Sequence, residues 1–244
     1  MFKLYQDGFI GDEYSRTEIE WRGGRDNQSN FESNTRKHDL SYFTRKPLTY
    51  SFNQYGHRCK DIQDVDLDNY ILFIGCSHTE GVGNFIDDTY PYIVSNSLQM
   101  DYYSLGLSGS GIDVQLHNLF TWTLRVKQPP KLLVWQWTLE PRVSIMNDIG
   151  ELHCIGSWSD DRNNLDFLMA ADKINFSKTK REFAKSVISN LPFPTVQVDI
   201  FKNEDVLYYQ RHDFARDLMH YGPKSNQVIS SLLINHINTK YSIG

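Results

Sequence analysis

Short apolar runs alternate with longer stretches of helical periodicity from about residue 69 to the end of the chain. The strands expected from these runs are 70–74, 102–105, 132–137 and 195–201. The helices expected between and after them are 90–98, 112–126, 177–191 and one that starts after Gly222-Pro223 with Ser225 as its cap. The first run is apolar throughout, which indicates a central strand covered on both faces. The alternation predicts an α/β fold with a central parallel sheet and crossover helices.

The first 46 residues have a different pattern. They are polar and mixed in charge, with a turn-rich centre at Arg22–Asn30. We expect a solvated N-terminal arm over 1–46 and the main domain over 47–244, with wrapping around that domain or a role in assembly as the alternatives for the arm. The oligomeric state stays open.

Composition excludes several classes of protein. The chain has 244 residues, 40% of them hydrophobic and 23% charged, which argues against disorder and fibrous repeats. The formal net charge is −5 and the basic residues are scattered, so nucleic acid is not an expected partner. No window approaches the ~20 apolar residues of a membrane helix, and the first residues lack the pattern of a secretion signal. We therefore expect a soluble protein without a membrane partner, located in the cytoplasm or associated with a virus.

The chain has three cysteines, Cys59, Cys76 and Cys154, which share no close spacing with one another. This favours a reduced compartment over a disulfide framework or a zinc site. Neither a metal nor an organic cofactor is expected.

A glycine-rich loop follows the first strand and contains Ser77 in Gly75-Cys76-Ser77-His78-Thr79-Glu80-Gly81-Val82-Gly83. In parallel sheets the ligand site lies beyond the carboxyl ends of the strands, so this serine is a candidate nucleophile. A phosphate cradle or a structural turn with a capping serine fits the loop equally as a pattern.

The second candidate element is Asp217-Leu218-Met219-His220, just before the last helix. An aspartate three positions before a histidine can orient the imidazole through one nitrogen while the other faces a nucleophile. A surface pair is the alternative. Asp213, seven positions before His220, is a conceivable rival to Asp217.

Together the two elements resemble the SGNH hydrolases, the GDSL-like esterase and lipase superfamily, over about residues 69–230. The resemblance implies a three-layer, flavodoxin-like α/β/α sandwich and ester hydrolysis by Ser77, His220 and Asp217. It also implies an oxyanion hole from the N–H groups of Ser77 and of Gly109, with Gly106 as the alternative glycine. One departure is that the asparagine expected after the third strand is missing, and Thr138 and Gln136 are the substitutes considered.

Four further residues or groups have both a functional and a structural interpretation. His78 and Arg58 are candidate substrate contacts, together with Gln136, although Asn53–Arg58 also fits a structural turn. Trp135, Trp137 and Trp158 could stack on a sugar, but two of them share one strand face, which favours core packing. Cys76 is expected to be a buried thiol beside the nucleophile.

The resulting prediction is a serine esterase that acts on a small acyl ester, for which an O-acetyl carbohydrate is the example suggested by the breadth of the family. One alternative is a catalytically impaired module of the same fold used for binding or structure, for instance in a virion. Another is a flavodoxin-like flavin binder, which leaves the Asp217–His220 pair without a role.

Overall fold

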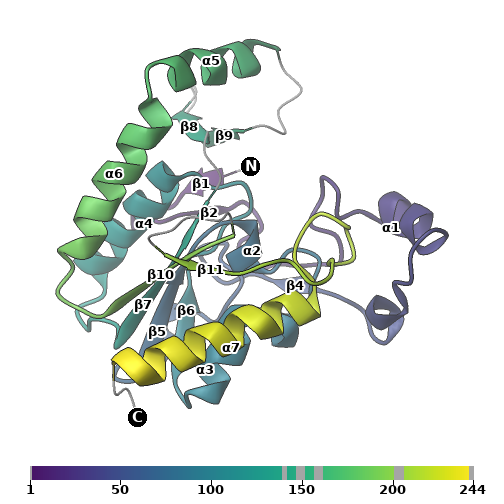
Figure 1. Cartoon of the computed structure of the whole chain (residues 1–244), viewed down its shortest axis with the longest axis horizontal. Helices are drawn as coiled ribbons and strands as arrows, with labels where there is room; N and C mark the ends of the chain where they lie inside the picture. The colour runs from purple at the N-terminus through teal and green to yellow at the C-terminus, as the bar shows by residue number, and fades with distance from the viewer. Residues whose placement is uncertain (1, 139–141, 147–151, 157–161, 201–205, 242–244) are drawn as a thin grey trace.

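A five-stranded parallel sheet forms the centre of the computed structural model, which describes residues 2–138, 142–146, 152–156, 162–200 and 206–241 (Figure 1). Its strands are β5 (Tyr70–Ile74), β6 (Asp101–Ser104), β7 (Leu132–Trp137), β10 (Thr195–Asp199) and β11 (Leu207–Tyr208). They lie in the spatial order β6-β5-β7-β10-β11, and neighbouring strands are parallel. Numbered along the chain within this sheet, that order is 2-1-3-4-5, the flavodoxin-like arrangement. The predicted α/β fold with a central parallel sheet is confirmed.

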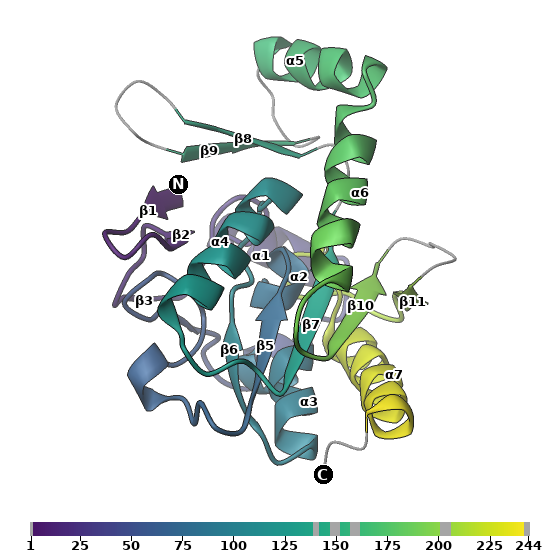
Figure 2. The same ribbon diagram turned by 90° about the vertical axis from the view of Figure 1, so that its left-hand side faces the viewer.

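Helices cover both faces of the sheet and complete three layers (Figure 2). Helices α4 (Ile112–Arg125) and α6 (Phe176–Ser189) pack on one face, and α3 (Tyr90–Ser97) and α7 (Pro223–Lys240) on the other. Strand β5 lies between the two helical layers. Its even-numbered residues pack in the core beneath α4 and α6, and its odd-numbered residues pack in the core beneath α3 and α7. All five of its side chains are fully buried, as a strand with no polar face requires.

The cap of the last helix differs from the sequence-based expectation. Helix α7 begins at Pro223 with Gly222 at the N-cap, and Ser225 lies inside the first turn. The backbone N–H groups of Lys224 and Ser225 donate to the carboxylate of Asp213 at 2.9 and 2.8 Å. Asp213 therefore supplies the capping interaction expected of Ser225, because a carboxylate can accept from two N–H groups of a first turn.

Several elements were not predicted. They are β1 (Phe2–Leu4), β2 (Ile10–Asp12), β3 (Glu18–Ile19), α1 (Gln28–Thr35), η1 (Ser41–Thr44), β4 (Tyr50–Ser51), η2 (Ile62–Asp64), α2 (Ser77–Glu80), η3 (Ile86–Asp88), β8 (Val143–Met146), β9 (Leu152–Ile155), α5 (Arg162–Lys173) and β11 (Leu207–Tyr208). Most are too short to show a period in the sequence. Figure 2 shows the β8–β9 hairpin and α5 beyond the carboxyl ends of the central strands.

Parts of the N-terminal segment pack onto the rest of the chain, whereas helix α1 within it has no buried residue. Strand β1 pairs with both β2 and β9, which builds a second, antiparallel sheet in the order β2-β1-β9-β8. Strand β3 pairs with β4. Phe9 joins the core under α4, and Leu40 and Phe43 are buried in a separate apolar cluster. The boundary at residue 46 stays a prediction, and within the described residues no helix has the length and apolar character to cross a membrane.

Candidate active site

Ser77 lies at the carboxyl end of β5, as the first residue of the short helix α2. Gly75, two residues earlier, lets Thr79 pack closely against the backbone of this loop, because a Cβ at Gly75 would lie 1.9 Å from Thr79 Oγ1. From β7, the side-chain oxygen of Gln136 accepts from the N–H of Cys76 at 3.2 Å and from Thr79 Oγ1 at 3.1 Å. Gln136 is fully buried. These contacts make it a brace of the serine loop in place of the substrate contact expected from the sequence.

Arg58 braces the other end of α2. Its guanidinium donates to the carbonyl oxygens of Gly81 at 2.7 Å and Asn84 at 2.9 Å, and it is 3% exposed. It belongs to the turn that starts at Asn53, where the N–H of Gly56 donates to the Asn53 carbonyl at 3.0 Å. The structural interpretation of this segment therefore accounts for Arg58, whose side chain is buried against backbone carbonyls.

His220 is oriented by Asp217. Its Nδ1 lies 2.5 Å from Asp217 Oδ2, while Asp217 Oδ1 accepts the backbone N–H groups of Met219 and His220. Burial alone would raise the pKa of Asp217, but the hydrogen bonds and charge of His220 outweigh it and hold that pKa below its ordinary value. Asp217 is thus an ionised partner that fixes the ring through Nδ1 and leaves Nε2 available.

The ring of His78 packs against the proposed base. The ring centroids of His78 and His220 are 5.1 Å apart, and Tyr221 meets His78 edge-on at 4.8 Å. Burial lowers the pKa of His78 well below its ordinary range, and the charges of His220 and Arg142 lower it further. His78 is therefore neutral, which avoids a second positive charge beside His220 when that ring takes up a proton.

The loop after β6 carries the glycines of the expected oxyanion hole. The N–H of Leu107 and the hydroxyl of Ser110 both donate to the carbonyl of Gly75, at 3.3 and 3.1 Å, so the loop is fixed to the serine loop. Gly106 donates its N–H to Ser104 Oγ at 3.3 Å. Gly109 has a φ of 87° and, like Ser77, gives its N–H to no acceptor in the part of the chain that the structure describes. Gly109, and not Gly106, therefore offers a free donor.

Thr138 has partners that occupy its hydroxyl. It donates to the carbonyl of Ser110 at 3.2 Å and accepts from Arg142 Nη1 at 2.6 Å. It is 1% exposed. Its proton is therefore committed within the protein, and the third oxyanion donor expected at this position is not supplied by Thr138 in this arrangement.

The structure brings His220 next to the residue that follows Ser77, but no hydrogen bond joins Ser77 Oγ to His220 among the described residues. The Ser77 hydroxyl instead donates to Cys76 Sγ at 4.0 Å. Catalytic hydrogen bonds are often long in the absence of substrate and shorten only in the complex. The geometry therefore has an oriented histidine and two free N–H groups around a serine that is 5% exposed.

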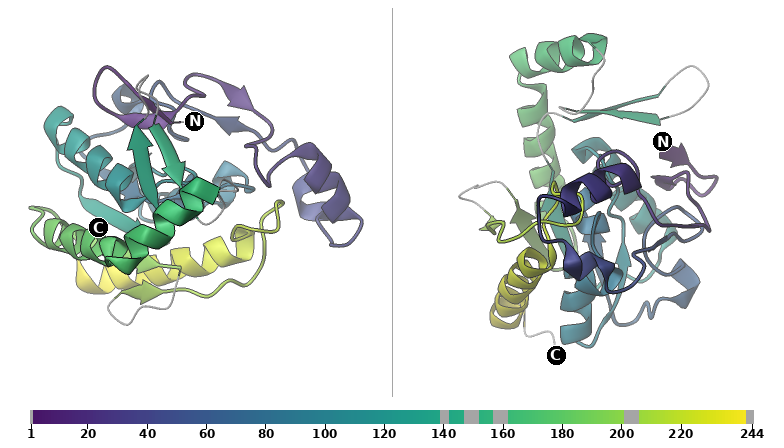
Figure 3. Two further views of the ribbon diagram at one scale, coloured as in Figure 1. Left: turned by 90° about the horizontal axis from the view of Figure 1, so that it is seen from above. Right: turned by 90° about the vertical axis from the view of Figure 1, so that its right-hand side faces the viewer.

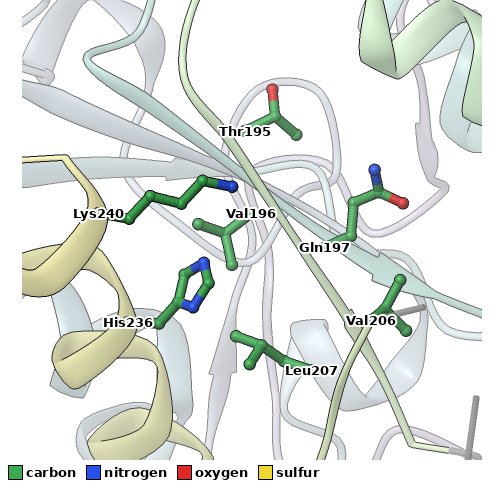
Figure 4. A pocket seen from close by; sticks show the side chains of 7 residues that line it. All are labelled: Thr195, Val196, Gln197, Val206, Leu207, His236 and Lys240. Carbon is green, nitrogen blue, oxygen red and sulfur yellow. The ribbon is translucent and has the colours of Figure 1, made fainter. Parts of the chain in front are cut away.

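Other candidate features lie outside this site. Trp135 and Trp137 are fully buried in the core, so they form no sugar-stacking surface, and Trp158 is outside the described residues. Over the described ranges, no group of three His, Cys, Asp or Glu side chains could hold a metal ion. A cavity of about 290 Å³ lies between β10, β11 and the end of α7, with His236 and Lys240 on its wall (Figure 4). It contains none of the site residues.

One buried residue that links the two loops of the site was not anticipated. Glu80, in α2, is 2% exposed, and its Oε2 accepts the N–H of Ser108 at 2.5 Å, directly before Gly109. It thus joins the serine helix to the oxyanion loop. The sequence did contain a sign of this role, because Glu80 is the only carboxylate in a loop of glycines and small residues. A carboxylate that is buried in such a loop requires hydrogen-bonding or charged partners.

Comparisons with known proteins gave matches among solved structures alone: no family model matches the chain, and no curated protein does. It is similar to an acetyl xylan esterase from Butyrivibrio proteoclasticus, with a TM-score of 0.42 and 15% identity over 72% of this chain and 65% of the other. A family two carbohydrate esterase from Clostridium thermocellum, in complex with cellohexaose, matches with a TM-score of 0.43 and 13% identity over 74% and 66%. A G-D-S-L family protein from Desulfitobacterium hafniense gives 0.38 and 12% over 68% and 98%.

The chain spans slightly less than two thirds of the length of the two carbohydrate esterases. Because these TM-scores lie below 0.5, the function of this chain is inferred from its own residues. The solved structures to which it is similar carry the names of carbohydrate esterases and of the G-D-S-L family.

Proposed function

We propose that the chain is a serine hydrolase of the SGNH type that cleaves a small acyl ester. The observation that carries the proposal is the Asp217–His220 hydrogen bond of 2.5 Å, in a loop whose histidine ring packs against the neighbour of Ser77. The free N–H groups of Ser77 and Gly109 support it, because an acyl transfer needs donors where negative charge develops.

The proposed reaction begins with attack of Ser77 Oγ on the ester carbonyl. His220 takes the hydroxyl proton through Nε2, and the carboxylate of Asp217 holds the tautomer and stabilises the imidazolium. The N–H groups of Ser77 and Gly109 bind the oxyanion. His220 then gives the proton to the departing alcohol, and water repeats the sequence to release the acid from the acyl-enzyme.

The missing third donor affects the expected rate. Removing one donor from an oxyanion hole costs about 2.7–4 kcal/mol in the barrier, so a site with two donors turns over slowly. A small acyl group remains the proposed substrate, and an O-acetyl carbohydrate is the natural ester to be tested first.

The test is hydrolysis of para-nitrophenyl acetate by the purified chain, beside Ser77→Ala and His220→Ala variants whose folding is checked by circular dichroism. We expect turnover in the unaltered chain and its loss in both variants. A fluorophosphonate probe should label Ser77 in the unaltered chain and leave Ser77→Ala unlabelled. Acetylated xylan then serves as the carbohydrate substrate.

A catalytically impaired module is the second candidate, and the absent Ser77–His220 hydrogen bond is the observation that favours it. Equal hydrolysis rates in all three proteins, with no labelling of Ser77, would support that module and contradict the esterase. A yellow protein with a flavin absorption spectrum would instead support the flavin binder.

A further inference from the structure

A turn of the N-terminal segment reaches both loops of the proposed active site. This turn, Glu20–Asp26, closes through Gly23 and Asp26, whose N–H and carbonyl groups exchange hydrogen bonds of 2.9 and 3.0 Å. Gly23 has a φ of 91°, a conformation that favours glycine. The N–H of Arg22 donates to Asp26 Oδ2 at 3.1 Å. Figures 1 and 3 show the purple N-terminal segment beside the yellow-green loop that precedes α7.

Asp26 holds the residue next to the proposed orienting carboxylate. Arg216 donates through Nε to Asp26 Oδ1 at 2.6 Å and through Nη2 to Oδ2 at 3.0 Å. Both side chains are almost fully buried, at 5% and 1% exposure. Arg216 Nη2 also donates to the carbonyl of Glu20, and its guanidinium lies 4.0 Å from the ring centre of Trp21. The turn thus encloses Arg216, which directly precedes Asp217.

The same carboxylate reaches the serine loop through Tyr50. The Tyr50 hydroxyl donates to Asp26 Oδ2 at 2.5 Å and accepts the N–H of Gly83 at 2.8 Å. The carbonyl of Gly83 in turn accepts the N–H of Arg216 at 3.2 Å. Asp26, Tyr50, Gly83 and Arg216 therefore form a closed set of contacts between the N-terminal segment and the two loops that carry Ser77 and His220.

The segment that carries His220 needs such support. Leu218, between Asp217 and His220, has a φ of 56°, which is unfavourable for a leucine. Its side chain packs against an apolar cluster made largely by the N-terminal half of the chain, which includes Leu40, Phe43 and Tyr50. Packing of Leu218 and the pairing of Arg216 hold this conformation from both sides of Asp217.

Arg22 acts at the other loop. Its Nε donates to Glu80 Oε1 at 2.5 Å and its Nη2 pairs with Asp12. The second oxygen of Glu80 accepts the N–H of Ser108, beside Gly109. Arg22 therefore positions Glu80, and Glu80 positions the loop of Gly109. Arg22 lies four residues before Asp26, which positions the segment of His220 through Arg216.

We infer that the Glu20–Asp26 turn is a positioning element for catalysis: Asp26 acts through Arg216 on the Asp217–His220 pair, and Arg22 acts through Glu80 on the loop of Gly109. The inference rests on the proposed function. Its physical basis is that misplacing a reacting group by ~1 Å costs up to about 10²-fold in rate. None of the residues of the turn touches the substrate.

The test compares Asp26→Asn with the unaltered chain in para-nitrophenyl acetate hydrolysis. Asparagine keeps the shape and an acceptor but removes the charge that Arg216 pairs with. We expect kcat to fall about 10-fold or more, with KM changed less than about twofold, because placement of the base and not binding is altered. Lys46→Gln, which breaks an exposed ion pair of the same segment with Asp87, is the matched control and should retain full activity.

A double variant separates positioning from general damage to the fold. In an Asp217→Asn background, the rate at which a fluorophosphonate labels Ser77 is measured. There Asp26→Asn should cause a smaller loss than in the unaltered chain, since its effect on the base passes through Asp217. An additive loss overturns the inference. If Asp26→Asn does not fold, Arg216→Lys replaces it, because lysine keeps the charge but cannot make both bonds to Asp26.

The outcomes also separate this inference from the proposed function. If hydrolysis depends on Ser77 but the rate of Asp26→Asn stays within twofold of the unaltered chain, the inference is overturned and the proposed function stands. Absence of Ser77-dependent hydrolysis and labelling in the unaltered chain overturns the proposed function and the inference with it.

Discussion

His57 is one buried histidine through which the stability of this fold should respond to acid. Its ring is fully buried, with Nε2 3.1 Å from the carbonyl of Ile10 in β2 and Nδ1 3.0 Å from the hydroxyl of Tyr103 in β6. A carbonyl can only accept, so Nε2 carries the proton and Nδ1 accepts from Tyr103. The neutral ring therefore has both nitrogens hydrogen-bonded, and a second proton on Nδ1 would displace the hydrogen bond donated by Tyr103.

Burial lowers the pKa of His57 from 6.5 to about 4. Between these values the unfolded chain binds a proton at His57 that the folded chain does not. The free energy of unfolding therefore falls as the pH drops through this window, by roughly 1.4 kcal/mol per pH unit. The loss attributable to His57 is about 2 kcal/mol at pH 5 and about 3 kcal/mol across the window.

Urea unfolding, followed by tryptophan fluorescence at pH 7.5, 6 and 5, measures this loss. His57→Gln should be less stable than the unaltered chain at pH 7.5, because it disturbs buried hydrogen bonds worth about 1–3 kcal/mol. Its further loss between pH 7.5 and 5 should be smaller than that of the unaltered chain by about 2 kcal/mol. His38→Gln, at an exposed histidine, serves as the control and should follow the unaltered chain. Parallel pH dependences for His57→Gln and the unaltered chain would refute the reasoning.

Two further predictions concern the proposed active site. Asp217→Asn keeps an acceptor for the N–H groups of Met219 and His220 but loses the charge that fixes the ring, so hydrolysis should fall by on the order of 10⁴ while the urea midpoint changes little; a loss below tenfold contradicts the orienting role. Gly75→Ala places a Cβ 1.9 Å from Thr79 Oγ1 and should destabilise the fold by about 1–3 kcal/mol in thermal unfolding. Adding Thr79→Ala should restore part of that stability, and no restoration contradicts the steric explanation.

The central sheet could be predicted because its pattern is local. An apolar run such as Tyr70–Ile74 has no polar face, so it requires cover on both sides, and the structure provides two helices on each. The strands β1 to β4 could not be predicted, because two or three residues show no period. Two of their pairings, β1 with β9 and β3 with β4, also join segments far apart in the sequence.

The site residues divide in the same way. Asp217 and His220 lie three positions apart, so their pairing could be read from the sequence. The roles of Arg58, Gln136 and Thr138 could not, because each depends on a carbonyl or side chain from another element. Polar residues at strand ends look alike in sequence whether they face a ligand or brace a loop.

The charged residues of the N-terminal segment are a further case in which the sequence does not reveal the role. Its charges made it look like a solvated extension, since a buried charge cannot be told from an exposed one by composition. In the fold, Asp26 meets Arg216, 190 positions later, and Arg22 meets Glu80, 58 positions later. Buried pairs of this kind are costly to form unless both partners are held in place, and breaking one leaves an uncompensated charge. Two such pairs meet at one turn, and their partners are Arg216, directly before Asp217, and Glu80, in the helix that begins at Ser77. The chain thus concentrates its most position-dependent interactions where ester hydrolysis would need fixed geometry.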